Sequence, residues 1–169
     1  MSTLFVDTLE PNQNTAITAA AGKLLPAGHV VQVVESTTTQ DTAISTANTF
    51  FDVGHSLSIT PTSATSKIYL SHFAGGIAKV VGGASFGIRL IRDGVVQEYN
   101  DRIGYSNDPS YWSSVNWSCI FYDSPATTSQ VTYTLEITCL SNASTSGLRY
   151  NSLHNVNNTT RLIAMEIPQ

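Results

Sequence analysis

Residues 130–140, QVTYTLEITCL, decide the fold class of this 169-residue chain. Apolar and polar side chains alternate along the stretch, with Val131, Tyr133, Leu135, Ile137 and Cys139 on one face and Thr132, Thr134, Glu136 and Thr138 on the other. A period of two is typical of an extended strand that buries one face and leaves the other in water. The stretch therefore predicts a half-buried antiparallel strand.

The same period recurs on both sides of this stretch. It places Val115, Trp117, Cys119 and Phe121 on one face of residues 114–123. It also places Ile68, Leu70 and His72 opposite Tyr69 and Phe73, and Ile163, Met165 and Ile167 on one face of the closing run. Asp93-Gly94 separates two β-prone runs, and Asp-Gly favours a hairpin because the type I′ turn needs positive φ. Residues 60–66 and 123–129 are Pro-containing connectors.

About eight strand-like runs follow residue 29, a number and spacing typical of a sandwich or a jelly roll. We therefore predict an all-β chain in two parts. An extended N-terminal segment, residues 1–28, precedes an antiparallel β-sandwich (jelly-roll-like), residues 29–169. The two longest stretches without clear periodicity, 75–85 and 100–112, are expected to be irregular.

Composition narrows the possible partners. The charged fraction is 12% and the formal net charge is −4, with the eight Lys and Arg residues scattered along the chain. Nucleic-acid binding needs a clustered basic face, so no nucleic acid is expected. No apolar run reaches the length of a membrane span, so no membrane insertion is expected. We expect Cys119 and Cys139 to be buried thiols, although a disulfide between facing strands stays open.

The opening of the chain is apolar without a visible partner. Leu4, Phe5, Val6 and Leu9 favour a strand, yet Pro11 and an Ala-rich connector follow them. The opening lacks the charged region and cleavage site of a secretory signal. We expect these side chains to be buried by copies of the same chain, so that the segment serves oligomerisation and anchoring.

We find no sequence motif that indicates catalysis. Residues 83–87, GASFG, match the G-x-S-x-G nucleophile elbow, but that motif must open a helix and the next residues favour a strand. Asp101, Asp108 and Asp123 are lone carboxylates rather than a defined acid pair. We expect no enzyme and no cofactor.

Metal ligation is not expected either. His29, His55, His72 and His154 are far apart in the sequence, so each is interpreted as a loop or core-edge residue. In a trimer, His72 or His154 near the axis could still be brought together from three copies.

The best binding candidate is the stretch 100–112, which combines aromatic rings with carboxylate and amide groups. Aromatic faces pack on the apolar faces of sugar rings, and acidic groups accept hydrogen bonds from sugar hydroxyls. We therefore interpret Tyr105, Asp108, Tyr111 and Trp112 as candidate receptor-binding residues for a host surface polysaccharide. In the alternative interpretation, Tyr111 and Trp112 begin the next strand and pack in the core or between subunits.

The order of several short segments resembles a known group. LFVDTLEPN (4–12) followed by LLPAGHVVQVVES (24–36) is similar to the N-terminal segment of bacteriophage tail-fibre and virion structural proteins, particularly of marine and cyanobacterial phages. LSITPTSATSKIYL (57–70) and FYDSPATTSQVTYTLEI (121–137) resemble the C-terminal β-domain of that group. The resemblance implies a homotrimer with a jelly roll like those of the tumour-necrosis-factor and complement-C1q families.

The resemblance also implies a function. It predicts a tail fibre or fibre tip that is assembled in the host cytoplasm, resides in the virion beside other tail or capsid proteins, and attaches to the host surface. The alternatives are a capsid fibre or decoration protein without a receptor, a depolymerase acting on surface polysaccharide, and a free-standing lectin.

Overall fold

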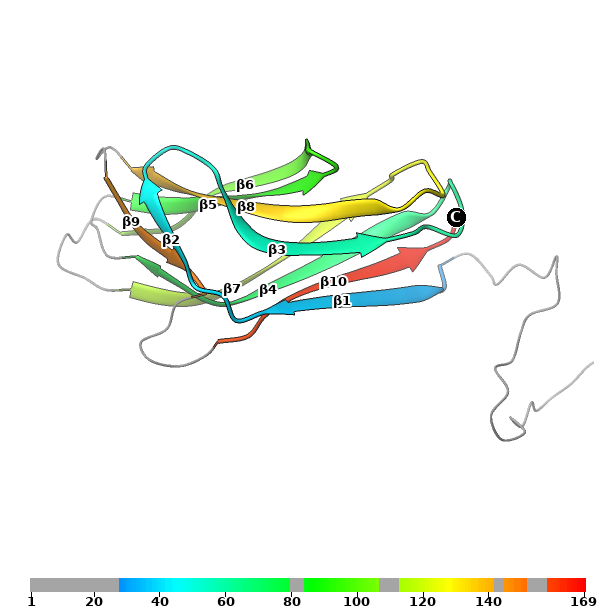
Figure 1. Cartoon of the computed structure of the whole chain (residues 1–169), viewed down its shortest axis with the longest axis horizontal. Helices are drawn as coiled ribbons and strands as arrows, with labels where there is room; N and C mark the ends of the chain where they lie inside the picture. Colours follow the sequence, from blue (N-terminus) through cyan, green and yellow to red (C-terminus); the bar gives the residue numbers. More distant parts are fainter. Residues whose placement is uncertain (1–27, 80–83, 107–112, 142–144, 152–157) are drawn as a thin grey trace, which may run out of the picture.

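The computed structural model describes residues 28–79, 84–106, 113–141, 145–151 and 158–169, which form two antiparallel β-sheets packed face to face (Figure 1). The strands are β1 (Gln32–Thr38), β2 (Thr42–Thr46), β3 (Phe51–Ile59), β4 (Lys67–Lys79), β5 (Ala84–Arg92), β6 (Val95–Ser106), β7 (Ser113–Asp123), β8 (Val131–Ser141), β9 (Thr145–Tyr150) and β10 (Thr160–Ile167). The prediction of an all-β antiparallel sandwich is confirmed.

The strands pair as a nest centred on one turn. β5 pairs with β6, β4 with β7, β3 with β8, β2 with β9 and β1 with β10, each pair antiparallel. Asp93 and Gly94, which join β5 to β6, have φ values of 48° and 83°, as the predicted Asp-Gly turn requires. The nested pairs divide between the two sheets: β1·β10, β2·β9 and β4·β7 lie in one sheet, and β3·β8 and β5·β6 lie in the other.

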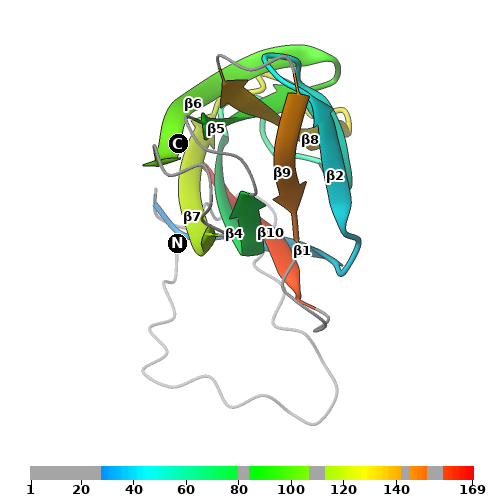
Figure 2. The same cartoon turned by 90° about the vertical axis from the view of Figure 1, so that its left-hand side faces the viewer.

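The order of strands in each sheet follows from that division. The four-stranded sheet, called sheet B, has the order β3-β8-β5-β6, and the six-stranded sheet, called sheet A, contains β1-β10-β4 with β7 along the other edge of β4. This alternation of early and late strands is jelly-roll connectivity. β9 and β2 extend sheet A, and Figure 2 shows them closing one side of the sandwich between the two layers.

The core lies between the sheets and follows the predicted alternation on β8. Val131, Tyr133, Leu135, Ile137 and Cys139 are all buried, and they meet Ile68, Leu70 and Phe121 from sheet A in one apolar cluster. Ile68, Leu70 and His72 face inward on β4, while Phe73 is 42% exposed. Both cysteines are free thiols; Cys139 is buried as expected, whereas Cys119 is only partly buried.

Three sequence-based expectations need correction. The described residues contain ten strands rather than eight, because β2 and β9 were missed. The stretches 75–85 and 100–112 are not irregular throughout, because β4 runs to Lys79, β5 starts at Ala84 and β6 runs to Ser106. On β10 the buried side chains are Thr160, Leu162, Ala164 and Glu166, so the face of Ile163, Met165 and Ile167 is not the core face.

A bulge explains how β4 continues through its glycines. The pairing of β4 with β7 shifts register between Ala74 and Ile77, and there the Gly75 N–H donates to Thr160 Oγ1 at 3.1 Å. Thr160 in turn donates to Asn151 Oδ1 at 3.0 Å, and Asn151 Nδ2 donates to the Thr38 carbonyl at 3.2 Å. A side chain at Gly75 would meet backbone at 2.8 Å, so only glycine fits here.

Buried Glu166 fixes the connection between β3 and β4. It is fully buried, and its carboxylate accepts hydrogen bonds from the Thr62 N–H and hydroxyl at 2.7 Å, from Ser66 Oγ at 2.6 Å and from Gln32 Nε2 at 2.6 Å. Burial alone would raise its pKa, but these donors together hold the pKa below its ordinary value of 4.5. The residue is therefore an anchor for residues 60–66 and not a catalytic acid.

Candidate functional site

The described residues at the start and finish of the chain lie at one end of the sandwich, here called the chain-entry end. The Gly28 N–H donates to the Pro168 carbonyl at 3.5 Å, and Gln32 at the start of β1 lies opposite Glu166 near the finish of β10. The connections β3–β4 and β7–β8 lie at this end too, since Lys67 pairs with Ile167 and Ile68 with Asp123 (Figure 1, right).

The other end, called the distal end, gathers the limits of five strands. Lys79, the last residue of β4, pairs with Ser113, the first residue of β7. Ala84, the first residue of β5, pairs with both Ser106 of β6 and Ser141 of β8. The strands that precede and follow residues 107–112 therefore reach the distal end (Figure 1, left).

Only part of the predicted binding set lies within the described residues. Tyr105 lies in β6, one residue before its end at the distal end. Asp108, Tyr111 and Trp112 lie outside the described residues, so their role as receptor-binding residues stays a prediction. The same holds for the predicted oligomerisation residues Leu4, Phe5, Val6 and Leu9.

The histidine interpretation is corrected for two residues, since His55 and His72 lie on strands and are buried. His72 Nε2 lies 2.7 Å from the Tyr150 hydroxyl, and Nδ1 lies 3.9 Å from Cys119 Sγ. Its ring stacks on Tyr150 at 6.0 Å and an interplanar angle of 12°, with Trp117 at 5.9 Å. Burial, with a smaller contribution from His55, lowers the pKa of His72 to about 3.

The Cys119–His72 contact resembles a nucleophile–base pair but lacks its electrostatics. A catalytic cysteine needs a thiolate, which a neighbouring cation or a helix N-terminus stabilises. Here burial and, secondarily, the Glu98 carboxylate raise the pKa of Cys119, and His72 stays neutral. Thiol, imidazole and phenol therefore form a neutral polar cluster within the sandwich.

His55 completes this polar interior. Its Nε2 lies 3.0 Å from the Ser36 carbonyl, which fixes Nε2 as the protonated nitrogen. Its buried Nδ1 finds no partner among the described residues. Burial lowers its pKa, partly offset by that backbone hydrogen bond.

Two other predicted candidates have structural surroundings. Ser85 is buried within β5 and pairs with Leu140 of β8, so the G-x-S-x-G match lies on a strand as expected. Asp123 accepts hydrogen bonds from Arg92 Nη1 at 2.5 Å and from the Tyr133 hydroxyl at 2.7 Å. Asp123 is thus a bridge between the sheets.

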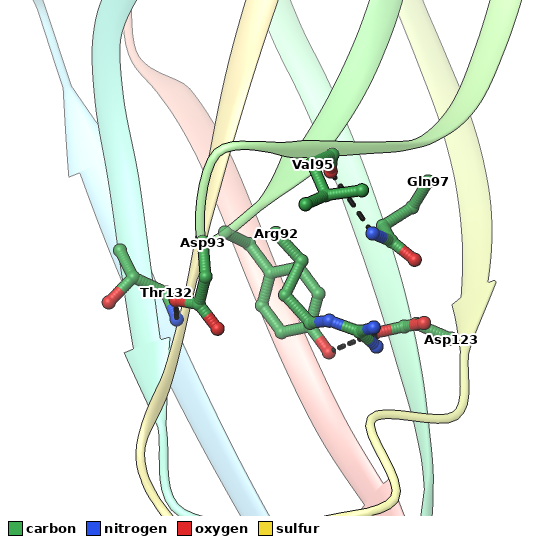
Figure 3. A network of polar contacts seen from close by, with 7 residues as sticks. Arg92, Asp93, Val95, Gln97, Asp123 and Thr132 are labelled. Carbon is green, nitrogen blue, oxygen red and sulfur yellow. Dashed lines mark hydrogen bonds and ion pairs between the residues drawn. The ribbon is translucent and has the colours of Figure 1, made fainter.

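Figure 3 shows this bridge beside the central turn. The Asp93 N–H donates to the Thr132 carbonyl at 3.0 Å, and the Thr132 N–H donates to Asp93 Oδ1 at 2.9 Å. Arg92 extends from the turn to Asp123 (Figure 3). The β5–β6 hairpin is therefore fastened to β7 and β8 on both sides of its tip.

Neither a metal cluster nor a spanning helix is found within the described ranges. No three His, Cys, Asp or Glu side chains converge among those residues. No helix long and apolar enough to cross a membrane occurs in that part of the chain.

Comparisons with known proteins find similar chains among solved structures. No protein-family model matches the chain, and no curated protein matches it. The crystal structure of the infectious bursal disease virus VP2 subviral particle is similar with a TM-score of 0.42 and 13% identity. The match covers 91% of this chain and 37% of that chain, so this chain spans little more than a third of its length.

Proposed function

We propose that this chain is a structural protein of a virus particle, a homotrimeric phage tail fibre or fibre tip that attaches to the host surface. The observation that carries the proposal is the division of the sandwich into two ends. The chain enters and leaves at one end, while the strands on both sides of the predicted binding loop end at the other. If residues 1–28 anchor the chain to the particle, the distal end points away from the particle.

The fold and surface chemistry suit such a role. Double-sheet jelly rolls occur in viral capsid proteins and in lectins. The two sheets are tied together by Arg92, Asp123 and Tyr133, which makes the sandwich a stiff support for loops at its end. Burial keeps both the Cys119 thiol and the His72 imidazole neutral, so this contact supplies no activated nucleophile.

Attachment would be multivalent. Three copies held in parallel present three distal ends, and contacts that are weak singly gain avidity because the second and third bind at high effective concentration. Tyr105, Asp108, Tyr111 and Trp112 would supply the contacts, with aromatic rings against sugar faces and Asp108 against hydroxyls.

A binding experiment tests this proposal. Fluorescently labelled protein should bind cyanobacterial cells and lipopolysaccharide isolated from them, and Trp112→Ala should weaken binding at least tenfold without changing the circular dichroism spectrum. Thr128→Ala, in the exposed β7–β8 connection at the chain-entry end, is the control and should bind like the wild type.

Three results would overturn parts of the proposal. Equal binding by Trp112→Ala and the wild type would remove the assignment of the loop. A trimer that enters particles but binds neither cells nor lipopolysaccharide would replace the fibre with a capsid fibre or decoration protein. Loss of polysaccharide viscosity on incubation would indicate a depolymerase.

A further inference from the structure

The outward side of sheet A is apolar over three rows of residues that the strand register aligns. The first row runs Val33, Met165, Tyr69 and Tyr122 across β1, β10, β4 and β7. Val33 is 58% exposed and Tyr122 is 65% exposed, and Tyr69 packs edge-on against Tyr122 at 5.1 Å. This row therefore crosses four strands of sheet A, with its most exposed side chains on β1 and β7.

The next two rows continue this surface. Ile163, Ser71 and Ile120 follow Glu35 across the second row, and Phe73 lies between Arg161 and Ser118 in the third. Ile120 is 50% exposed and Phe73 is 42% exposed. We call the six residues that dominate the three rows the apolar face: Val33, Tyr69, Phe73, Ile120, Tyr122 and Met165.

The outward side of sheet B has the opposite character along β3, β8 and β5. Ser58 and Thr132 share a hydrogen bond of 2.9 Å, and Ser56 lies opposite Thr134. Glu136 lies between Asp52 and Arg89 and pairs with Arg89 at 2.5 Å. Along these three strands sheet B presents polar side chains to water, and its exposed apolar residues Val95, Val96 and Tyr99 lie on the edge strand β6.

Charge points to a copy of the same chain as the occupant. Glu35 and Arg161, the charged members of the three rows, form an ion pair with each other. Copies of this face can therefore meet without placing like charges together, which costs affinity at an interface. The composition also matches interface centres, which are enriched in Tyr, Phe and Met and depleted in charge.

Area agrees with self-association. Four strands at about 4.8 Å spacing and three rows at about 6.8 Å spacing cover about 400 Å². A standard interface buries about 800 Å² per partner, with a dry centre inside a polar rim. The apolar face supplies such a centre, and the flanking serine, threonine and ion-paired residues supply a rim.

We propose that the apolar face of sheet A is the surface through which copies of this chain associate. The proposal rests on the proposed function only for the number of copies, since the face is argued from the described residues. In a trimer, each copy turns sheet A toward the three-fold axis and sheet B toward solvent. The interface then runs along the sandwich and does not depend on residues 1–27.

Sedimentation of full-length protein tests the proposal. The wild type should sediment with three times the 18.1 kDa of one chain. Val33→Asp/Tyr122→Asp should raise the dissociation constant about 30-fold or more, the effect of losing an interface hot spot. Both positions are exposed on edge strands, so the variant should keep its circular dichroism spectrum. Ser56→Asp/Ser58→Asp, at two exposed positions of β3 on sheet B, adds the same two charges as a control and should stay associated.

The outcomes separate the two proposals. A variant that remains trimeric overturns the assignment of the face while leaving the trimer intact. A monomeric wild type overturns both. Deletion of residues 2–27 is the last experiment. If the truncated protein is a trimer that dissociates on Val33→Asp/Tyr122→Asp, the result supports the apolar face as the interface. If the truncated protein is a monomer, association depends on the N-terminal segment and the assignment of the face is overturned.

Discussion

Acid should destabilise the domain through His72, by an amount that its burial fixes. The imidazole is fully buried, and its pKa is about 3 in the folded chain against 6.5 when exposed. Between these values the unfolded chain binds a proton that the folded chain does not. The contribution of His72 to stability is therefore intact above pH 6.5 and is lost as the pH falls toward 3.

The magnitude follows from proton linkage. One proton taken up on unfolding changes the free energy of unfolding by about 1.4 kcal/mol per pH unit. Lowering the pH from 6.5 to 4.5 should thus remove about 2.5 kcal/mol through His72 alone. His55 adds to the slope in the same direction, because burial lowers its pKa as well.

Urea denaturation followed by tryptophan fluorescence, at several pH values and one protein concentration, measures this slope. His72→Gln should lower the free energy of unfolding at pH 7 but reduce its dependence on pH by about 1.4 kcal/mol per unit. Tyr150→Phe is the matched control, because it removes the hydrogen bond at 2.7 Å and keeps the buried imidazole. It should therefore retain the wild-type slope.

Equal dependence of the free energy of unfolding on pH in the wild type and His72→Gln would refute the reasoning, since His72 would then have the same pKa in the folded and unfolded chains. A flat profile in Tyr150→Phe would instead make the hydrogen bond, and not burial, the cause of the lowered pKa.

Other substitutions probe the anchors of the fold. Glu166→Gln should lower the free energy of unfolding at pH 7 by about 2–4 kcal/mol, measured by urea denaturation, because charge-assisted hydrogen bonds are lost within the core. The pKa of the carboxylate lies below 4.5, so the difference between variant and wild type should shrink as the pH falls below 4.5. Gly75→Ala should lower the free energy of unfolding by about 2–3 kcal/mol, because the added methyl group overpacks the bulge. Gly94→Ala should lower it by only about 1 kcal/mol, because Gly94 has a φ of 83° but open space around it. The reverse order would contradict the packing at the bulge. Tyr133→Phe should cost about 1–2 kcal/mol by calorimetry, and no loss would mean that Asp123 is satisfied by Arg92 alone.

Strands with one polar and one apolar face were predictable, and β8 shows why. Its threonines and its core residues alternate without conflict, so periodicity identifies both the strand and its buried side. β10 carries apolar residues on both sides, and there the pattern cannot choose. Glu166 faces inward because Gln32, Thr62 and Ser66 supply donors from distant parts of the chain, which periodicity does not reveal.

The missed strands have weak local signals. β2 and β9 are short, and Ile44 and Leu148 are their main core contacts apart from Tyr150. The glycines within residues 75–85 suggested an irregular stretch, although β4 continues through a bulge at Gly75 as far as Lys79. Both errors arise because tertiary pairing, rather than local propensity, holds these segments extended.

The candidate sites were predictable to different extents. The Asp93-Gly94 turn could be predicted, because this dipeptide favours the positive φ values that the turn requires and the β-prone runs on both sides are evident in the sequence. The surroundings of His72 could not, because β9, β7 and β4 bring Tyr150 and Cys119 to it from 78 and 47 residues away. The apolar face likewise appears only once the register aligns Val33, Met165, Tyr69 and Tyr122 across four strands.

The nested strand pairs have a consequence for the sequence of folding events. Gln32 and Glu166 lie 134 residues apart, so the β1·β10 pair formed alone would close a loop almost as long as the domain. If the inner pairs form first, each later pair has only a short loop left to close, and the entropy loss is divided into small steps. Formation of the pairs outward from Asp93-Gly94 would add β1 last, after the rest of the sandwich is built.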